Sequence, residues 1–291
     1  MKRRDWLKTV CATGGASLAA TGLRAAEPAE TQLIGDRVGV LVDTTKCIGC
    51  RMCESACARA NGLPEPEQQI DRSVRRDTTP DQWTVCNRYE TEKGVVYRKQ
   101  QCMHCLQPAC ASACLTKAMY RTSEGPVVWR ESKCMGCRFC MVSCPFDVPK
   151  FEYDSPVPKI QKCQLCWSRL QEGERPACVA GCPAGALTFG KRGELLDEAR
   201  RRIYTAPDEY VHGIYGEEEV GGTSWLYLAA VPFDQLGLRT DIGDTAFPTF
   251  TREFLYAVPL VLTLAPPFLL ALSRASRARE VAEEEGEGGE A

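Results

Sequence analysis

The fold of this chain is decided by a cysteine run at residues 134–145, which reads Cys134-Met-Gly-Cys137-Arg-Phe-Cys140-Met-Val-Ser-Cys144-Pro145. The same spacing occurs at Cys47-Ile-Gly-Cys50-Arg-Met-Cys53-Glu-Ser-Ala-Cys57. Two further runs lengthen one loop each: Cys102-Met-His-Cys105 leads to Cys110-Ala-Ser-Ala-Cys114, and Cys163-Gln-Leu-Cys166 leads to Cys178-Val-Ala-Gly-Cys182-Pro183. Sixteen of the eighteen cysteines therefore belong to four runs with one rhythm.

This rhythm is typical of [4Fe–4S] sites, in which three cysteines of a run bind one iron–sulfur cube and the fourth reaches a second cube. Cysteines separated by two residues in a tight loop can direct their sulfurs at neighbouring iron atoms. Gly49 and Gly136 let the backbone approach without a Cβ in the way. The fourth cysteine is expected to begin a helix and to face away from its own triplet. Four runs predict four cubes.

Disulfide bonds and structural zinc are the alternatives for so many cysteines. Disulfides do not require triplets at a fixed spacing. A structural zinc site takes its ligands in two pairs, which leaves the third and fourth cysteine of each run unexplained. Cube ligation is the interpretation that uses all sixteen positions.

The composition and the motifs limit the function classes. The chain has 291 residues and a formal net charge of −2, so nothing predicts a nucleic-acid partner. The sequence contains no legible nucleophile, flavin motif or substrate pocket, and each predicted cube has four cysteine ligands and no open iron position. We therefore expect an electron-transfer subunit and not an enzyme in its own right.

The first residues predict export to the periplasm. Residues 1–26 read as a twin-arginine signal peptide, because Arg3-Arg4-Asp5-Trp6-Leu7-Lys8 precedes a weakly apolar stretch. Cubes are assembled in the cytoplasm, so the protein must cross the membrane already folded, and the twin-arginine route permits this.

The last residues predict a membrane anchor. Residues 251–273 read as one transmembrane helix, since 254–272 carry no charge over nineteen residues. The alternative is a buried or amphipathic segment, because Pro259, Pro266 and Pro267 weaken a lone helix. Arginines at 274, 277 and 279 favour a cytoplasmic tail at 274–291 and place the cluster domain on the periplasmic face of the inner membrane. The Glu/Gly-rich end of this acidic tail, from Glu280, is expected to be disordered.

Between its ends the chain is expected to form an α+β fold of tandem bacterial-ferredoxin-like domains, with short β-hairpins and helices around the four cubes. Residues 27–190 would form this four-cluster domain, and 191–250 a docking extension. The pattern predicts strands at 37–42, 186–189 and 223–231, hairpins at 83–99 and 118–130, and a helix at 194–204.

Several longer stretches carry a resemblance to a known family. They are Lys99-Gln-Gln-Cys102-Met-His-Cys105, Cys137-Arg-Phe-Cys140-Met-Val-Ser-Cys144-Pro-Phe-Asp-Val-Pro-Lys150, Cys182-Pro-Ala-Gly-Ala186 and Ile214-Tyr-Gly-Glu-Glu-Glu-Val-Gly-Gly-Thr223. With the twin-arginine start and the anchor, they resemble the four-cluster ferredoxin-type subunits of membrane-bound respiratory oxidoreductases. The resemblance is strongest to the subunit of the quinone-linked [NiFe]-hydrogenases of the hydrogenase-2 type.

This resemblance implies partners in anaerobic respiration. The chain would carry electrons between the hydrogenase small and large subunits and an integral membrane subunit that reacts with quinone. The cysteine motifs alone also occur in the iron–sulfur subunits of molybdopterin enzymes of the formate, polysulfide and nitrite type. A molybdopterin catalytic subunit is therefore the alternative partner.

The resemblance also implies which runs share cubes, because in that family the first run pairs with the fourth and the second with the third. The implied ligand sets are Cys47, Cys50, Cys53 with Cys182; Cys163, Cys166, Cys178 with Cys57; Cys102, Cys105, Cys110 with Cys144; and Cys134, Cys137, Cys140 with Cys114. The motif by itself predicts crossed fourth ligands but not the partners.

A few residues outside the sixteen lie near the runs. Cys86 has no partner at ligand spacing and is expected to be a buried free thiol. His104 would either influence a cube, by donating to a sulfur or by charging near neutral pH, or be an ordinary loop residue. Arg51, Arg138 and Lys162 would favour the reduced cubes, unless they are solvated loop charges.

Overall fold

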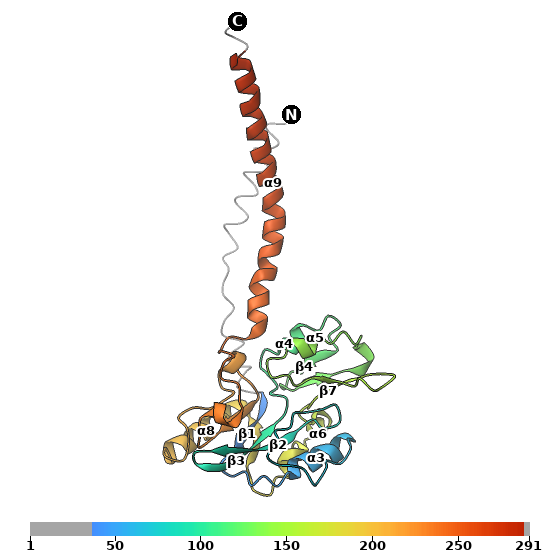
Figure 1. Ribbon diagram of the computed structural model, residues 1–291, viewed down its shortest axis with the longest axis vertical. Helices are drawn as coiled ribbons and strands as arrows, with labels where there is room; N and C mark the ends of the chain where they lie inside the picture. Colours follow the sequence, from blue (N-terminus) through green and yellow to red (C-terminus); the bar gives the residue numbers. More distant parts are fainter. Residues whose placement is uncertain (1–36, 288–291) are drawn as a thin grey trace.

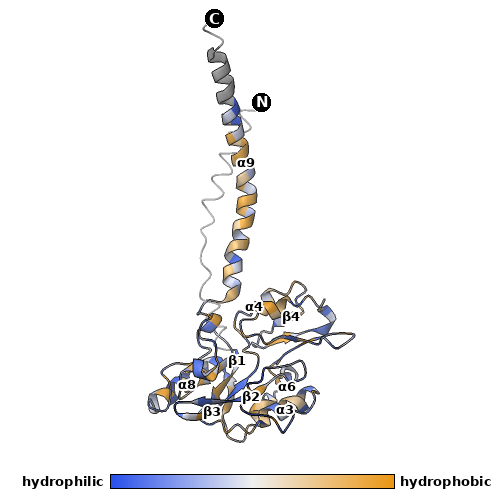
Figure 2. Cartoon of the chain, viewed as in Figure 1, coloured by the Kyte–Doolittle hydropathy of each residue, from blue (hydrophilic) through white to orange (hydrophobic). Residues whose placement is uncertain are grey.

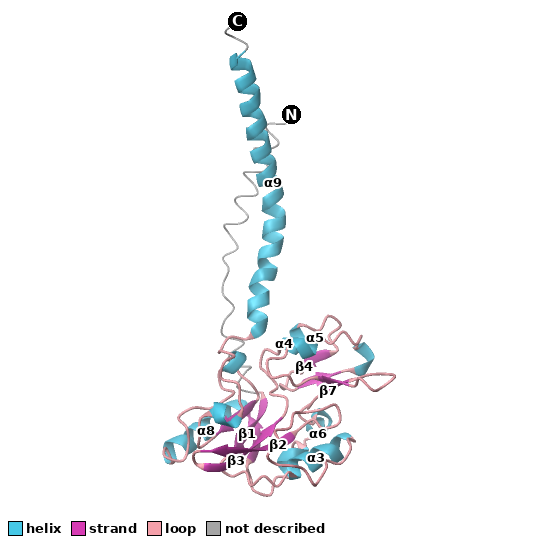
Figure 3. Cartoon of the chain, in the orientation of Figure 1, coloured by secondary structure: helices cyan, strands magenta, loops and turns pink. Residues whose placement is uncertain are grey.

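The structure, a computed structural model, describes residues 37–287, so the predicted signal at residues 1–26 lies outside the described part. Apart from one long C-terminal helix, its elements are short and are joined by loops (Figure 3). The strands are β1 (Val38–Asp43), β2 (Val85–Thr91), β3 (Gly94–Gln100), β4 (Met119–Arg121), β5 (Val127–Trp129), β6 (Lys150–Phe151), β7 (Ile160–Gln161), β8 (Leu187–Lys191) and β9 (Trp225–Leu228). The helices are α3 (Met52–Asn61), α4 (Ala109–Ser112), α5 (Phe139–Val142), α6 (Trp167–Gln171), α7 (Ala177–Ala180), α8 (Arg192–Thr205) and α9 (Phe247–Glu287), with 3₁₀ turns η1 (Glu131–Lys133), η2 (Glu219–Gly221) and η3 (Phe233–Leu236).

The elements form two neighbouring lobes, from which one long helix projects (Figure 1). The first lobe holds β1, β2, β3, α3, α6 and α8, and the second holds α4, α5, β4 and β7. The hairpins β2–β3 and β4–β5 are antiparallel pairs, one in each lobe. Each lobe therefore combines small hairpins with helices of a few turns at most.

A three-stranded sheet forms the core of the first lobe. β1 is its central strand, antiparallel to β8 and parallel to β9. Successive side chains of a strand point to opposite faces: Leu41 packs against Leu195 of α8, whereas Val40 and Val42 pack on the other face with Cys178. These three β1 residues are at most 2% exposed. The sheet thus joins the segment before the first cysteine run to the segments after the last.

The predicted short elements are confirmed. The strand at 37–42, both hairpins, the strand at 186–189 and the helix at 194–204 correspond to β1, β2–β3, β4–β5, β8 and α8. β9 is shorter than the predicted 223–231, and it lies in the central sheet, so part of segment 191–250 belongs to the core of the first lobe.

The prediction of a disordered end from Glu280 is wrong for the described residues, because α9 continues to Glu287. Alanine and glutamate are good helix formers. Extending an existing helix also requires no new nucleus. These two effects outweigh the high polarity of this stretch.

The helix α9 projects from the lobes (Figure 1), and much of its coloured part consists of apolar residues (Figure 2), many of them exposed between Phe250 and Leu272. Its three prolines, Pro259, Pro266 and Pro267, do not interrupt it, and its residues contact α4. Among the described residues it is the one helix long and apolar enough to cross a membrane, over Phe247–Arg277. None of its most apolar window is buried in the structure.

A buried carboxylate fixes the long loop after α3. Glu54 is 1% exposed and accepts two hydrogen bonds from Arg51, at 3.0 and 2.8 Å, and others from Arg76 and Gln82. The backbone N–H of Cys86 donates to it at 2.6 Å. Burial alone would raise the pKa of Glu54, but these donors hold it below its ordinary value. The carboxylate therefore adds stability above the ordinary carboxyl pKa, and this stability is lost as the pH falls through the folded-state pKa.

Glu54→Gln is expected to destabilise the protein strongly. It leaves the guanidinium of Arg51, which is 8% exposed, without its charge partner, and breaking a buried pair in this way costs about 3–5 kcal/mol. In a thermal melt the variant should lose roughly 10 °C in Tm. Glu65→Gln is the matched control, because its pair with Arg59 is exposed and should contribute about 0–1 kcal/mol. Equal Tm values for both variants would contradict the role assigned to Glu54.

Candidate metal centres

The first group of cysteines surrounds a cavity with about 400 Å³ of empty space. Cys47, Cys50 and Cys53 of the first run line it together with Cys182 of the last run. A fifth cysteine, Cys86 of β2, also lines it and lies beside Cys47 and Cys53. Its thiol lowers the pKa of Cys47 to about 7, against the effect of burial. Cys86 is buried, as predicted, but it lies at a predicted site and not apart from one.

The second group lines a pocket with about 320 Å³ of empty space, which includes open solvent. Its lining includes Cys163, Cys166 and Cys178 of the last run and Cys57 of the first. Burial raises the pKa of Cys57 to about 12, and the sulfurs of Cys178 and Cys166 add to the effect. Lys99 of β3 lines both this cavity and the first one, so the two cavities are neighbours.

The remaining two groups lie around α4 and α5 in the second lobe. In the third group, burial raises the pKa of Cys105, and the neighbouring thiols of Cys144, Cys102 and Cys110 raise it further. In the fourth group, burial raises the pKa of Cys140 to about 11, and the neighbouring thiols are those of Cys114, Cys134 and Cys137. The structure thus places the sixteen predicted ligands in four neighbouring groups.

Pairs of short helices hold neighbouring groups together. α3 carries Cys53 of the first group and Cys57 of the second, whereas α7 carries Cys178 of the second and precedes Cys182 of the first. α3 and α7 pack against each other. In the second lobe α4 and α5 pack in the same way, with Cys110 and Cys140 inside them and Cys114 and Cys144 just after.

This geometry corrects one expectation, that the fourth cysteine of a run begins a helix. The helix begins one residue before the third cysteine of each run, and the fourth cysteine follows the third by four residues. Residues four apart lie about one helical turn from each other on the same side. A single turn can therefore direct one sulfur into its own group and the next sulfur into the neighbouring group.

The second and third groups adjoin across the junction of the lobes. Cys57 and Cys163 of the second group and Cys102 of the third pack in one buried cluster with Trp83 and Val148. The first group adjoins the second through α3 and α7, and the third adjoins the fourth through α4 and α5. The four groups therefore form one unbroken series through the protein.

Left-handed backbone shapes the cysteine loops. Gly49 has φ +67°, and a Cβ there would collide with the ring of Tyr97, so both its conformation and its close contact require glycine. Gly136 has φ +72° and open space around it, so only its conformation favours glycine. Arg51 and Arg138, which follow the second cysteines of these runs, also have positive φ and precede α3 and α5.

His104 is fully buried between the cysteines of the second run. The N–H of Val127 donates to its Nδ1 at 2.9 Å, which places the ring proton on Nε2. Burial, followed by the charges of Lys162 and Lys99, holds the pKa of His104 well below its ordinary value, so the ring is neutral near pH 7. Nε2 is buried without a hydrogen-bond partner in the described structure. Sulfur held by the adjacent cysteines would supply the missing acceptor, which fits a cluster at this site.

The donor set also fits iron–sulfur clusters. None of the seventeen cysteines within residues 37–287 is joined in a disulfide in the structure. In the same residues, no three His, Cys, Asp or Glu side chains form a site for a single metal ion. Four thiols around a cavity are the ligands that a [4Fe–4S] cluster takes.

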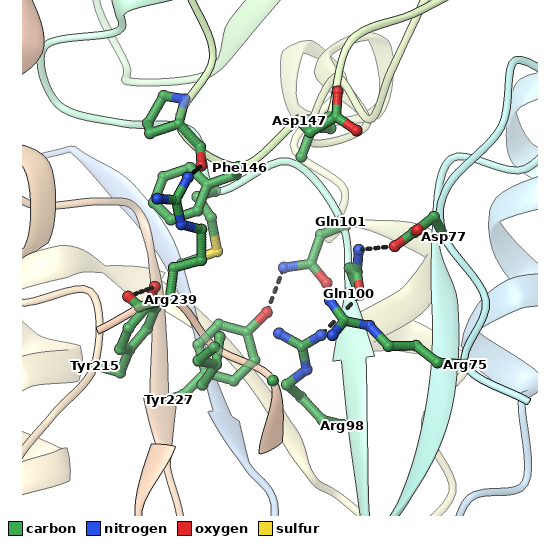
Figure 4. Close-up of a pocket in the computed structure, with 15 residues that line it drawn as sticks. Arg75, Asp77, Arg98, Gln100, Gln101, Phe146, Asp147, Tyr215, Tyr227 and Arg239 are labelled. Carbon is green, nitrogen blue, oxygen red and sulfur yellow. Dashed lines mark hydrogen bonds between the residues drawn. The ribbon is translucent and has the colours of Figure 1, made fainter. Parts of the chain in front are cut away.

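A larger cavity, with about 760 Å³ of empty space, lies beside these groups and has no cysteine in its lining (Figure 4). Arg75 and Arg98 extend into it from one side, and Gln101 lies beside Tyr227 (Figure 4). Gln101 donates to the Tyr227 hydroxyl at 2.7 Å. Polar and apolar side chains both line this cavity.

Comparisons with known proteins agree with this site. Residues 94–192 match the family of 4Fe-4S dicluster domains. A protein of Nitratidesulfovibrio vulgaris is 44% identical over 99% of this chain and 80% of its own length. The hydrogenase-2 operon protein HybA of Escherichia coli O157:H7 is 34% identical over 82% of this chain and 84% of HybA. The iron-sulfur subunit of the nitrate-inducible formate dehydrogenase of Escherichia coli K12 is 33% identical over 69% of this chain and 71% of that subunit.

These similarities extend far beyond the cysteine runs and cover most of both chains in each comparison. Together with the dicluster match, they support binding of [4Fe–4S] clusters. The chain therefore belongs to the family of iron–sulfur electron-transfer subunits of multisubunit respiratory oxidoreductases.

Proposed function

We propose that this chain holds four [4Fe–4S] clusters and carries electrons between a periplasmic [NiFe]-hydrogenase and an integral membrane subunit that reacts with quinone. The observation that carries the proposal is the unbroken series of four cysteine groups. The proposed ligands are those four groups, each with three cysteines of one run and the fourth cysteine of another. Agreement between the groups in space and the pairing implied by the family supports this ligand set.

The protein's own residues hold and shield the sites. The paired helices fix the sulfurs of adjacent groups relative to one another, because each pair contributes to both. Apolar side chains such as Met119, Val127 and Ile160 pack around Cys110 and Cys140 and keep water away. When bound, a [4Fe–4S] cluster takes up and releases one electron. For such transfer, the chain must hold the clusters rigidly, shield them from water and keep them close together.

The hydrogenase partner is favoured over a molybdopterin partner by the extent of the similarity. The match with HybA covers a larger share of both chains than the match with the formate dehydrogenase subunit. The formate dehydrogenase relatives support the second candidate, in which the catalytic subunit is a molybdopterin enzyme. Purification of the intact membrane complex followed by mass spectrometry distinguishes the two by the catalytic subunit that accompanies the chain.

We further propose that α9 anchors the chain in the membrane, with the cluster domain in the periplasm after twin-arginine export. The length and exposed apolar surface of α9 support the anchor. The arginines that follow its apolar stretch support the orientation. Segment 191–250 would then contribute to the surface that docks with partner subunits.

The cluster count is tested by chemical analysis. Protein purified without oxygen is expected to be brown and to contain about sixteen iron and about sixteen sulfide per chain, since each cube has four of each. Reduction by hydrogen in the intact complex, and not by formate, is the result expected for the hydrogenase assignment. A protein with about eight irons, or with stoichiometric zinc, would contradict the four-cluster proposal.

A further inference from the structure

Two lysines are buried in the middle of the series of cysteine groups. Lys99 is 3% exposed and Lys162 is 2% exposed. Lysine is almost never buried so completely unless it is paired, because an unpaired buried charge is costly. Within residues 37–287 neither ammonium has a carboxylate partner, and both donate to neutral oxygens instead. Their charges are therefore not compensated by the protein's acidic side chains.

Lys99 lies between the first and second groups. It lines the cavity of Cys47, Cys50 and Cys53 as well as the cavity of Cys57 and its partners. Its Nζ donates to Gln101 Oε1 at 3.1 Å and lies 4.5 Å from the centre of the Trp225 ring.

The position of Lys99 is fixed by Gln101 and Tyr227, two residues that line the cavity in Figure 4. Gln101 is held by the Tyr227 hydroxyl, which itself donates to the backbone carbonyl of Lys99 at 3.0 Å. These contacts hold the ammonium at the boundary of the two cavities without neutralising it.

Lys162 lies between the second and third groups. Its Nζ donates at 2.9 Å to the carbonyl of Cys163, a member of the second group. It also donates to the carbonyl of Val127, which packs with Cys110 of the third group. Burial raises the pKa of Cys144, another member of the third group, and the Lys162 charge opposes this. Lys162 therefore faces two groups, as Lys99 does.

We infer that Lys99 and Lys162 raise the reduction potentials of the clusters on both sides of them, so that three successive clusters share two fixed positive charges. The inference rests on the proposed function, because it requires clusters in all four groups. Four thiolates leave a bound cluster with a net negative charge, and reduction makes it more negative. A buried positive charge stabilises the reduced form more than the oxidised form, and low surrounding polarity strengthens the effect.

Other positive charges near the runs do not share this position. Arg51 is neutralised by Glu54 at 2.8 Å. Arg138 is exposed and stacks on the rings of Phe151 and Tyr153. Water screens an exposed charge. The two lysines are thus distinguished by burial combined with the lack of a carboxylate.

Replacement of each lysine by methionine tests the inference, since methionine keeps an unbranched side chain only one atom shorter and removes the charge. We expect redox titrations of the full-length protein, with EPR as the readout, to show two of the four reduction potentials lowered in Lys99→Met. Two should also be lowered in Lys162→Met. The equilibrium constant for one-electron reduction should fall by about tenfold, or ~59 mV. In the double variant three clusters should shift, one of them by the sum, and the fourth should stay unchanged.

Lys133→Met is the matched control, because Lys133 precedes Cys134 directly but is exposed, and no potential should move. Unchanged potentials in lysine variants that retain full iron content would overturn the inference. If a methionine variant loses iron, the charge-retaining Lys99→Arg and Lys162→Arg decide. Full iron in the arginine variants supports a role for the charge, and loss in both kinds overturns it in favour of packing. A wild-type protein with fewer than four clusters would contradict the proposed function instead.

Discussion

Cys182→Ser is expected to disrupt the first site and to leave the second nearly intact, although Cys182 belongs to the same run as three cysteines of the second. In the structure Cys182 lines the cavity of Cys47, Cys50 and Cys53. A serine oxygen is a poorer iron ligand than a thiolate. We therefore expect this cluster to lose either one iron or all of its iron, about four atoms. Iron analysis and EPR of the reduced protein measure the change.

Electron flow gives a second readout for the same variant. In membranes that contain the catalytic partner, quinone reduction should fall by roughly tenfold or more, as expected when metal ligation is weakened. Reduction of an artificial dye that accepts electrons at the catalytic partner should survive. A parallel loss of both activities without any cluster change would indicate an assembly role for Cys182 and would contradict its place as a ligand.

Cys86→Ser is the matched control, because Cys86 lines the same cavity and receives the same substitution. This variant is expected to keep all of its iron, with at most a shifted potential, since Cys86 contacts Cys47 and Cys53 but is not a proposed ligand. The reverse pattern, with iron lost from Cys86→Ser and kept in Cys182→Ser, would make Cys86 the fourth ligand of the first site.

Removal of residues 254–291 is expected to convert a membrane-bound protein into a soluble one that keeps its clusters. The truncation leaves Ala246, which is 4% exposed and packs near Gly221, and removes the exposed apolar part of α9. Each leucine, valine or phenylalanine at the centre of a spanning helix favours insertion by about 0.3–0.6 kcal/mol. The truncation removes the summed insertion free energy of all these residues. Carbonate washing of membranes from cells that lack the partner subunits, followed by iron analysis of both fractions, measures the outcome.

Removal of residues 280–291 alone is the control for this truncation. It deletes the acidic end of α9 but leaves the apolar stretch, so the protein should remain with the washed membranes. If the longer truncation also remained there, the membrane-spanning assignment of α9 would fail.

Local patterns were sufficient to predict most of the fold. The alternation of apolar and polar residues around short turns located both hairpins, and the apolar spacing after residue 190 located α8. The parallel pairing of β1 with β9 could not be predicted in this way, because the two strands lie far apart in the sequence and no turn joins them. The helical end of α9 does not follow from polarity, because the high polarity of this stretch predicts disorder whereas its helix propensity favours a helix.

The candidate site, too, could be predicted from the sequence only in part. Spacing identified the sixteen cysteines, since each run shapes its own loop, but their grouping depends on how the lobes fold. Cys86 and Lys99 lacked any spacing signal. They are nevertheless direct cross-strand partners in the β2–β3 hairpin, and residues opposite one another share a face. Register in a predicted hairpin could therefore have placed this cysteine and this lysine together.

The exchange of cysteines between paired helices has a consequence for biosynthesis. In the proposed ligand sets, the third and fourth sites are complete once Cys144 has been made, whereas the first and second wait for Cys178 and Cys182. We expect the third and fourth sites to be able to mature first, while the chain is still being synthesised. The early cysteines, Cys47 to Cys57, would stay exposed to oxidation throughout this interval. In the proposed sets, the order in which the ligands are synthesised would therefore favour protection of these early cysteines until the last run has been made.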